Sequence, residues 1–341
     1  MRKENDNTTK YPNKEVVEEI QKRQEDPDLK SGYHRMTYAL MLMGYVINHK
    51  KTYRLMKEHQ LLLSKPKGKD KTYAKYRTVC PTKPLEVFGM DIKLVYCTQE
   101  KRYAQIFTII DTFTRVAIYR EVNFKMKKEQ IVKAWRNVIE TIIQPLVNDP
   151  QEIHIEIRSD NGPQFIAKDL RSFFEENGLN HVFTHPYTPQ ENAHIESFHA
   201  ILCDSIDALN FSSISELEER LNIFYENYNN SRIHSSIANL TPILFWRLWD
   251  RKFIERKVKS NRKVKFYLKG EYQQLPGNTS RVEAPCHPLN ELAHSTEEKQ
   301  KVDGLNWPIT LMDNHRYKTS PGIAPCQSKI KENFSILESE N

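Results

Sequence analysis

Three acidic residues have the types and spacing that metal-dependent chemistry on a phosphodiester needs. Asp91 lies in VFGMDIKLVY, Asp160 in IEIRSDNGPQF and Glu196 in TPQENAHIESFHAIL, with 35 residues between the last two. Carboxylate oxygens suit Mg²⁺, and two such ions can bind a scissile phosphate between them. Gathered together, three anions repel one another and become partly protonated unless cations neutralise them. The trio therefore predicts a divalent-metal site in an enzyme.

Each carboxylate taken alone has an ordinary structural explanation. An aspartate in mid-strand is commonly salt-bridged, one before Asn-Gly commonly belongs to a turn, and a glutamate on an amphipathic helix is commonly solvated. A fourth acid, Asp111, ends a strand beside Thr112-Phe113-Thr114, where a role in the turn is the simpler interpretation. We therefore leave Asp111 out of the metal set.

Residues 85–250 contain the elements that must position these acids. Phe88, Met90 and Ile92 alternate on one face of a first strand, so Asp91 projects from the other face. Three sequential strands imply an antiparallel meander, and the alternating strands and helices that follow imply parallel pairing. The expected strands are about 86–96, 103–111, 115–122, 153–157 and 181–184, with helices at 127–143, 168–177 and from about 190. We expect an α/β fold, a ribonuclease-H-like mixed five-stranded sheet with flanking helices.

Residues 1–63 predict a small all-α module ahead of that core. Apolar residues recur at helical spacing in 14–25, and 36–43 is a second helix ended by Gly44. Asn48 can cap a third helix over 49–61. Three short helices in this order are typical of a helix-turn-helix.

The third helix of this module has a basic face. Tyr53 and Met56 are expected to face inward, which leaves four basic residues available to DNA phosphates or base edges. These residues are Lys50, Lys51, Arg54 and Lys57. In isolation a solvated basic helix is the better explanation of this pattern, but its place ahead of an acidic core favours DNA binding.

Charge is distributed unevenly along the 341 residues. The formal net charge of +7 divides into +9 over residues 1–84, −7 over 85–250 and +5 over 251–341. Basic flanks around an acidic centre suggest that the flanks bind a polyanion while the acidic centre binds cations. Residues 64–84 form a basic linker, and 251–341 is a basic segment and tail in which VKFYL is the one strand that we expect.

Five cysteines without paired spacing favour a reducing compartment. The N-terminus is polar, and the longest apolar run, YALMLMGYVI, is too short to span a bilayer. We therefore expect no membrane association and a cytoplasmic location. His34, His49, His59 and Cys80 lack the spacing of a zinc site.

Several sequence blocks resemble, in family order, the catalytic subunit of bacterial insertion-sequence transposases, whose core looks like that of retroviral integrases. A match of several blocks in order is far more specific than a match of one. The blocks are SGYHRMTYALMLMGYVINHKKTYRLMKEHQL, FGMDIKLV with IIDTFTR, RSDNGPQF, residues 185–203, and NYNNSRIHSSIANLTPILFW.

This resemblance implies a DDE-type enzyme for DNA integration. Asp91 and Asp160 would share two Mg²⁺ ions, for which Mn²⁺ can substitute, and Glu196 would complete the second site. Water as nucleophile gives strand cleavage, and a DNA 3′-hydroxyl gives strand transfer. The implied partners are double-stranded DNA at the element ends and the target, further copies of the chain in a homo-multimer, and an upstream-frame DNA-binding partner. The implied location is the bacterial nucleoid.

Two loops next to the acids have expected roles. Asn161 and Gly162 shape the bend after the strand that leads to Asp160, Gly162 through its backbone freedom. Before the Glu196 helix, Tyr187, Gln190 and Asn192 are candidates to meet the DNA end. An ordinary loop that leads into a helix is nearly as good an explanation for these last three.

Cys203 departs from the family pattern, because a Lys or Arg generally lies seven residues beyond the catalytic Glu. His199, one turn along the helix, is a candidate DNA contact that substitutes in part, although a plain surface histidine is the simpler interpretation. The departure keeps two alternatives open. One is a catalytically inactive, transposase-derived DNA-binding protein, and the other is a ribonuclease-H-like nuclease without joining activity.

Overall fold

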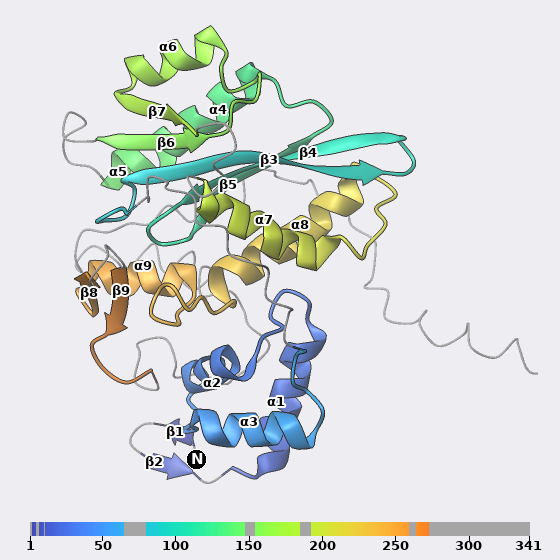
Figure 1. Ribbon diagram of the computed structural model, residues 1–341, viewed down its shortest axis with the longest axis vertical. Helices are drawn as coiled ribbons and strands as arrows, with labels where there is room; N and C mark the ends of the chain where they lie inside the picture. The colour runs from blue at the N-terminus through green and yellow to red at the C-terminus, as the bar shows by residue number, and fades with distance from the viewer. Residues whose placement is uncertain are drawn as a thin grey trace, which may run out of the picture.

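The computed structural model describes residues 2–4, 7–9, 11–64, 80–146, 154–184, 192–258 and 264–272. The expectations for Tyr187 and Gln190, for most of the basic linker and for the tail beyond 272 lie outside these ranges. Figure 1 shows a twisted central sheet, with helices α7 and α8 between the sheet and a separate group of N-terminal helices.

The sheet has the expected five strands in the order β5-β4-β3-β6-β7. β3 pairs antiparallel with β4, and β4 with β5, whereas β3 with β6 and β6 with β7 are parallel. The mixed sheet predicted from the sequence is therefore confirmed. Its strands are β3 (Val87–Cys97), β4 (Arg102–Asp111), β5 (Ala117–Asn123), β6 (Ile155–Ser159) and β7 (Leu179–Phe183).

One face of the sheet packs against α4 (Lys128–Val138) and α6 (Lys168–Glu176). Phe88 and Met90 of β3 are fully buried there and contact Trp135, whose indole nitrogen lies 3.3 Å from the Met90 sulfur. The expected helix over 127–143 changes to π-helical hydrogen bonding over Ile139–Ile143 and continues into a short α5 (Gln144–Leu146).

The opposite face packs against α7 (Ala193–Ile206) and α8 (Ile214–Asn230). Phe198 of α7 contacts Phe224 and Tyr225 of α8, and these aromatic rings are buried. Residue types that alternate along β3 therefore separate two distinct apolar layers. Asp91 lies on the α7 side, as its strand position predicts.

The N-terminal module begins with a two-stranded hairpin that the sequence did not indicate, β1 (Arg2–Glu4) and β2 (Asn7–Thr9). The three expected helices follow, α1 (Asn13–Glu25), α2 (Tyr33–Leu42) and α3 (His49–Glu58). Gly44 has a φ of 86°, a left-handed conformation that ends the α2 segment at little cost for glycine. The Asn48 side chain accepts a hydrogen bond of 2.9 Å from the Lys51 amide, which confirms the predicted cap.

The expectation that Tyr53 faces inward is wrong. Thr52, Leu55 and Met56 are the buried residues of α3, at the spacing of one helix face, and Tyr53 falls outside that face with 41% of its surface exposed. Its ring instead packs edge-on against Tyr33 on the surface, with 5.1 Å between centroids.

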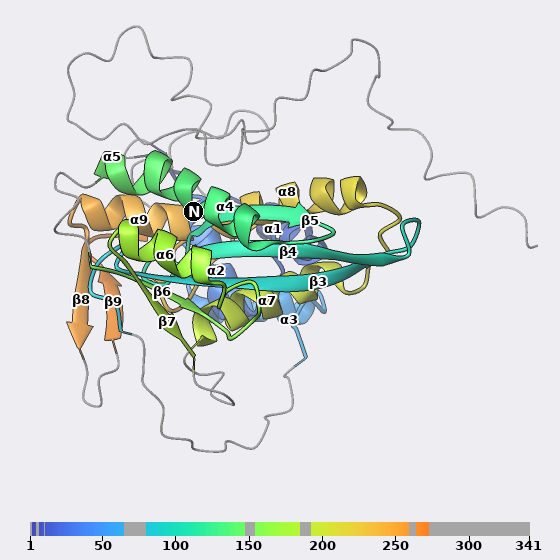
Figure 2. The ribbon, with the colours of Figure 1, turned by 90° about the horizontal axis from the view of Figure 1, so that it is seen from above.

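The C-terminal part of the described chain contains α9 (Pro242–Asp250), β8 (Ile254–Val258) and β9 (Val264–Leu268). β9 is the strand predicted from VKFYL, and it pairs antiparallel with β8. Phe245 and Phe266 pack around Phe113 of the turn after β4. Figures 1 and 2 both show this hairpin at the end of the molecule opposite the tip of the β3–β4 hairpin.

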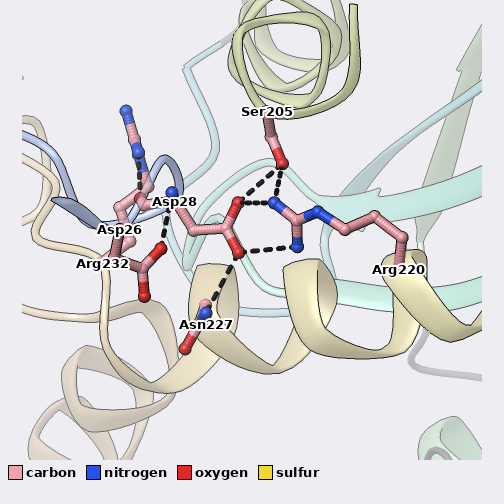
Figure 3. Close-up of polar contacts among 6 residues, drawn as sticks. All are labelled: Asp26, Asp28, Ser205, Arg220, Asn227 and Arg232. Carbon is pink, nitrogen blue, oxygen red and sulfur yellow. Dashed lines mark hydrogen bonds and ion pairs between the residues drawn. The ribbon is translucent and has the colours of Figure 1, made fainter. Parts of the chain in front are cut away.

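A buried acid joins the N-terminal module to the core. Asp28, in the turn after α1, is only 2% exposed. Its carboxylate accepts hydrogen bonds from Ser205 of α7 at 2.6 Å, from Arg220 of α8 at 2.5 and 3.0 Å, and from Asn227 of α8 at 3.0 Å (Figure 3). The Arg232 guanidinium donates to the Asp28 carbonyl. One carboxylate therefore connects three segments that are distant in the sequence.

Across the described part of the chain, none of the helices combines the length and the apolar character that a membrane crossing requires. The cysteines in those ranges, Cys80, Cys97 and Cys203, are free thiols.

Candidate active site

Asp91 lies in the middle of β3, and its side chain is 22% exposed. The parallel register pairs Gly89 with Arg158 of β6. Asp91 and Asp160 each lie two residues beyond this pair, past the last paired residues of the two strands. Adjacent strands therefore bring the first two acids to the same region of the sheet, although they are 69 positions apart in the sequence.

Asp160 is the residue directly after β6, where the strand gives way to a loop. Its Oδ1 accepts a hydrogen bond of 3.0 Å from the Gly162 amide, and the Asn161 side chain donates to the Thr184 carbonyl at 3.0 Å. Gly162 does not use a left-handed conformation. A Cβ at this position would lie 2.5 Å from Nε2 of Gln164 and 3.1 Å from the Asp160 carboxylate. An alanine here would therefore require the ends of the Gln164 and Asp160 side chains to shift, and a left-handed backbone is not the reason for the glycine.

Glu196 comes from helix α7, which runs alongside β3. The Cβ that Gly89 lacks would contact Ile195, at 3.5 Å from its Cβ, so the helix approaches the strand closely at this point. Further along, Nδ1 of His199 lies 3.3 Å from Oδ2 of Asp91. Glu196, one turn before His199, therefore faces the same end of the strand.

The acids interact electrostatically. Partial burial raises the pKa of Asp160, and the negative charge of Asp91 raises it further. The pKa of Glu196 is also raised, first by partial burial and then by Asp91, whereas His199 acts in the opposite direction. Asp91 is therefore the common neighbour through which the other two acids are linked. Such mutual repulsion is the pattern expected where a cation is to be bound.

The donor set fits a hard divalent cation, because it consists of three carboxylates on separate elements. Within the described ranges, however, no three His, Cys, Asp or Glu side chains are already arranged as a metal site. Both oxygens of Asp91 have other contacts, Oδ1 with the Ile92 amide at 2.7 Å and Oδ2 with His199.

Asp111 has the turn role expected of it. Its buried carboxylate accepts hydrogen bonds from the amide and hydroxyl of Thr114 and from the Leu85 amide. Burial raises the pKa of Asp111, and these hydrogen bonds counteract the rise only in part. The carboxylate is therefore fully used in stabilising the β4–β5 turn.

The predicted DNA contacts lie in different environments. Lys50, Arg54 and Lys57 are exposed on α3, Lys51 is half-buried, and Arg54 lies 3.8 Å from Glu58. Asn192 is only 8% exposed at the start of α7, so its side chain is not displayed on the surface as expected. The His199 side chain is 12% exposed and contacts Asp91, so it is not a plain surface residue.

Lys93 is a residue near the site that the sequence analysis missed. It lies two positions beyond Asp91, hence on the same face of β3, and is close enough to Cys203 of α7 for that side chain to raise the pKa of Lys93. The alternation along the strand was the signal that could have identified it.

Comparisons with known proteins agree with this architecture. Two family models, both described as an integrase core domain, match residues 81–189 and 177–242. The chain is 26% identical over 218 residues to an uncharacterized 39.2 kDa protein of insertion element IS476 from Xanthomonas euvesicatoria, an alignment that covers 63% of this chain and 60% of that protein. It is 28% identical over 228 residues to the putative transposase InsK of insertion sequence IS150 from Escherichia coli, covering 62% and 76%.

Two solved structures give weaker likenesses. The catalytic core domain of HTLV-2 integrase in complex with magnesium has a TM-score of 0.33 at 16% identity, covering 49% of this chain and 97% of that one. The simian T-cell lymphotropic virus intasome in complex with a PP2A regulatory subunit has a TM-score of 0.40 at 11% identity, covering 68% and 74%.

The ribonuclease-H-like sheet and the two matched models define an integrase-core protein. The relatives from insertion elements narrow the assignment further. Over residues 81–242 the chain resembles integrase cores, and its similar relatives include proteins of bacterial insertion elements.

Proposed function

We propose that this protein cleaves DNA strands at the ends of an insertion sequence and joins the resulting 3′-hydroxyl to target DNA. The observation that carries the proposal is that the charge of Asp91 on β3 acts on both Asp160, after β6, and Glu196, on α7, inside a region that matches integrase cores. Asp91 raises the pKa of both Asp160 and Glu196, which suits a site whose charge is balanced by cations.

Asp91 and Asp160 would share the two metal ions as ligands, and Glu196 would complete the second metal site. The residues fit Mg²⁺, and Mn²⁺ accepts the same ligands. When bound, two such ions activate the attacking oxygen and stabilise the leaving one. His199, whose Nδ1 contacts Oδ2 of Asp91, would orient that carboxylate beside the site. The same site then uses water for cleavage and a 3′-hydroxyl for joining.

Each segment of the chain has its own proposed role. Residues 1–63 would bind element-end DNA, with Lys50, Lys51, Arg54 and Lys57 of α3 as the contacts. Residues 64–84 would contact the DNA backbone between the two modules. Residues 85–250 would catalyse cleavage and joining, and residues 251–341 would add a basic flank. Because paired joining brings two DNA ends together, we propose a homo-multimer acting on the nucleoid, assisted by an upstream-frame DNA-binding partner.

The test uses purified protein with labelled terminal-repeat DNA and either Mg²⁺ or Mn²⁺. Joined products are expected. Cleavage without joining would favour the nuclease alternative, and binding without cleavage the inactive DNA-binding protein. Asp91→Asn, Asp160→Asn and Glu196→Gln are each expected to abolish cleavage and joining while DNA binding persists. Glu175→Gln, an exposed acid on α6, is the matched control and should retain activity. Joining at wild-type rate by any of the three variants would overturn the assignment.

A further inference from the structure

The contacts between β3 and α7 recur in a regular series. Gly89 faces Ile195, Asp91 contacts His199, and Lys93 contacts Cys203. Each step is two residues on the strand and four on the helix. Two strand residues advance about 6.6 Å and four helix residues about 6.0 Å, so the two elements stay nearly in register as they run in the same direction.

This register gives Lys93 a defined position relative to the acids. Lys93 lies two residues after Asp91 on β3. The residue that faces it on α7, Cys203, lies one helical turn after His199. Cys203 and Asp207 lie on its helix side and Asp91 on its strand side. Lys93 is therefore a cation held at the edge of an anionic site.

The anionic site needs such a cation. Three carboxylates and a DNA strand carry charge of the same sign, and metal ions neutralise the charge only at the scissile phosphate. The neighbouring phosphates of the same strand still have to approach Asp91 and Asp207. An ammonium with several N–H donors, next to a weakly polar thiol, has donors to spare for an incoming phosphate oxygen.

We propose that Lys93 binds a DNA phosphate next to the scissile one, so that β3 supplies the positive charge that the Cys203 position on α7 lacks. The proposal rests on the DNA-joining function proposed above. A lysine ammonium is positively charged at neutral pH, and Lys93 has the anionic Asp91 two residues before it on the same face of β3.

The test compares Lys93→Ala with Lys133→Ala, which removes an exposed lysine from α4 on the opposite face of the sheet. End-DNA binding is measured by titration at several salt concentrations. Loss of one phosphate contact should lower the slope of log K against log salt by about 0.9, so the affinity ratio between 50 and 200 mM salt should shrink by about threefold. Lys133→Ala should leave this slope unchanged.

A second variant separates charge from local packing. In the exchange Lys93→Cys with Cys203→Lys, the ammonium moves to the facing position on α7 while the same two side chains meet. The exchange should restore the salt slope and most of the joining rate lost in Lys93→Ala, and Lys93→Arg should behave likewise. An unchanged slope in Lys93→Ala, or an exchange no better than Lys93→Ala, would overturn the proposal.

The two proposals can fail separately. If the wild-type protein joins DNA but Lys93→Ala has the wild-type salt slope, the role of Lys93 is wrong and the function stands. If the wild-type protein binds end DNA without joining it, and Lys93→Ala still lowers the slope, the function is wrong and the phosphate contact stands.

Discussion

The guanidinium of Arg220 holds both oxygens of the Asp28 carboxylate, with NH1 3.0 Å from Oδ2 and NH2 2.5 Å from Oδ1. Such two-point contact between Arg and a carboxylate fixes direction as well as distance. Because Asp28 follows α1 and Arg220 lies on α8, the pair orients the N-terminal module on the core. Asp28 is almost fully buried, so its charge depends on these partners.

Asp28→Asn should therefore destabilise the protein strongly. Removing one partner of a buried ion pair leaves the other charge without compensation, and we expect a loss of about 3 kcal/mol in the free energy of unfolding. Urea unfolding followed by circular dichroism measures the change. Glu25→Gln, at an exposed position just before the same turn, is the control and should stay within about 0.5 kcal/mol of wild type. Equal losses in both variants would contradict the assigned role.

The same pair predicts a pH dependence. Burial alone would raise the pKa of Asp28, but the hydrogen bonds from Arg220, Ser205 and Asn227 outweigh it and hold the pKa below the ordinary 3.8. A lowered folded-state pKa contributes stability above pH 3.8, and this contribution is lost as the pH falls through the folded-state value. The difference in Tm between wild type and Asp28→Asn should thus be constant from pH 7 to about pH 5 and shrink below about pH 4. A constant difference down to pH 2 would count against the ion pair.

Asp160→Asn should stabilise the metal-free protein while it abolishes joining. The raised pKa of Asp160 means that burial and Asp91 disfavour its charged form, and this destabilises the folded state at neutral pH. Asparagine removes the charge and can still accept the hydrogen bond from the Gly162 amide. We expect a Tm increase of about 1–2 °C without metal, together with a smaller Tm increase on adding Mg²⁺ than in wild type. Differential scanning calorimetry measures both, and a lower metal-free Tm would argue against repulsion in the site.

Gly162→Ala should impair joining more than folding. The added Cβ would press on the Gln164 side chain and the Asp160 carboxylate, and small displacements of a reacting group are costly in rate. We expect joining to slow by roughly 10- to 100-fold. Gly32→Ala is a suitable control, because nothing lies within 4 Å of the Cβ that it adds. Adding Gln164→Ala to Gly162→Ala should recover part of the rate if crowding is the cause.

The sequence predicted those parts of the molecule that depend on local pattern. Alternation along residues 87–97 identified both faces of β3, and Asn48 and Gly44 marked helix ends that the structure confirms. Tyr53 was misplaced because the buried face of a short helix is fixed by its partners, here α1 and α2, as much as by spacing.

Relationships between distant segments could not be read from the sequence. The partners of Asp28 lie 177 to 199 positions away, and nothing near Asp28 indicates them. The contact between Lys93 and Cys203 likewise depends on how α7 crosses the sheet. Such contacts follow from tertiary packing, which a one-dimensional pattern does not encode.

Helix α7 carries Glu196 near its start and Ser205, a partner of Asp28, nine residues later. About 13 Å of continuous helix separates the two. If the N-terminal module binds DNA as proposed, a force on that module would reach, through Asp28, the same helix that carries Glu196. Binding of the element end and the position of Glu196 would then be mechanically coupled.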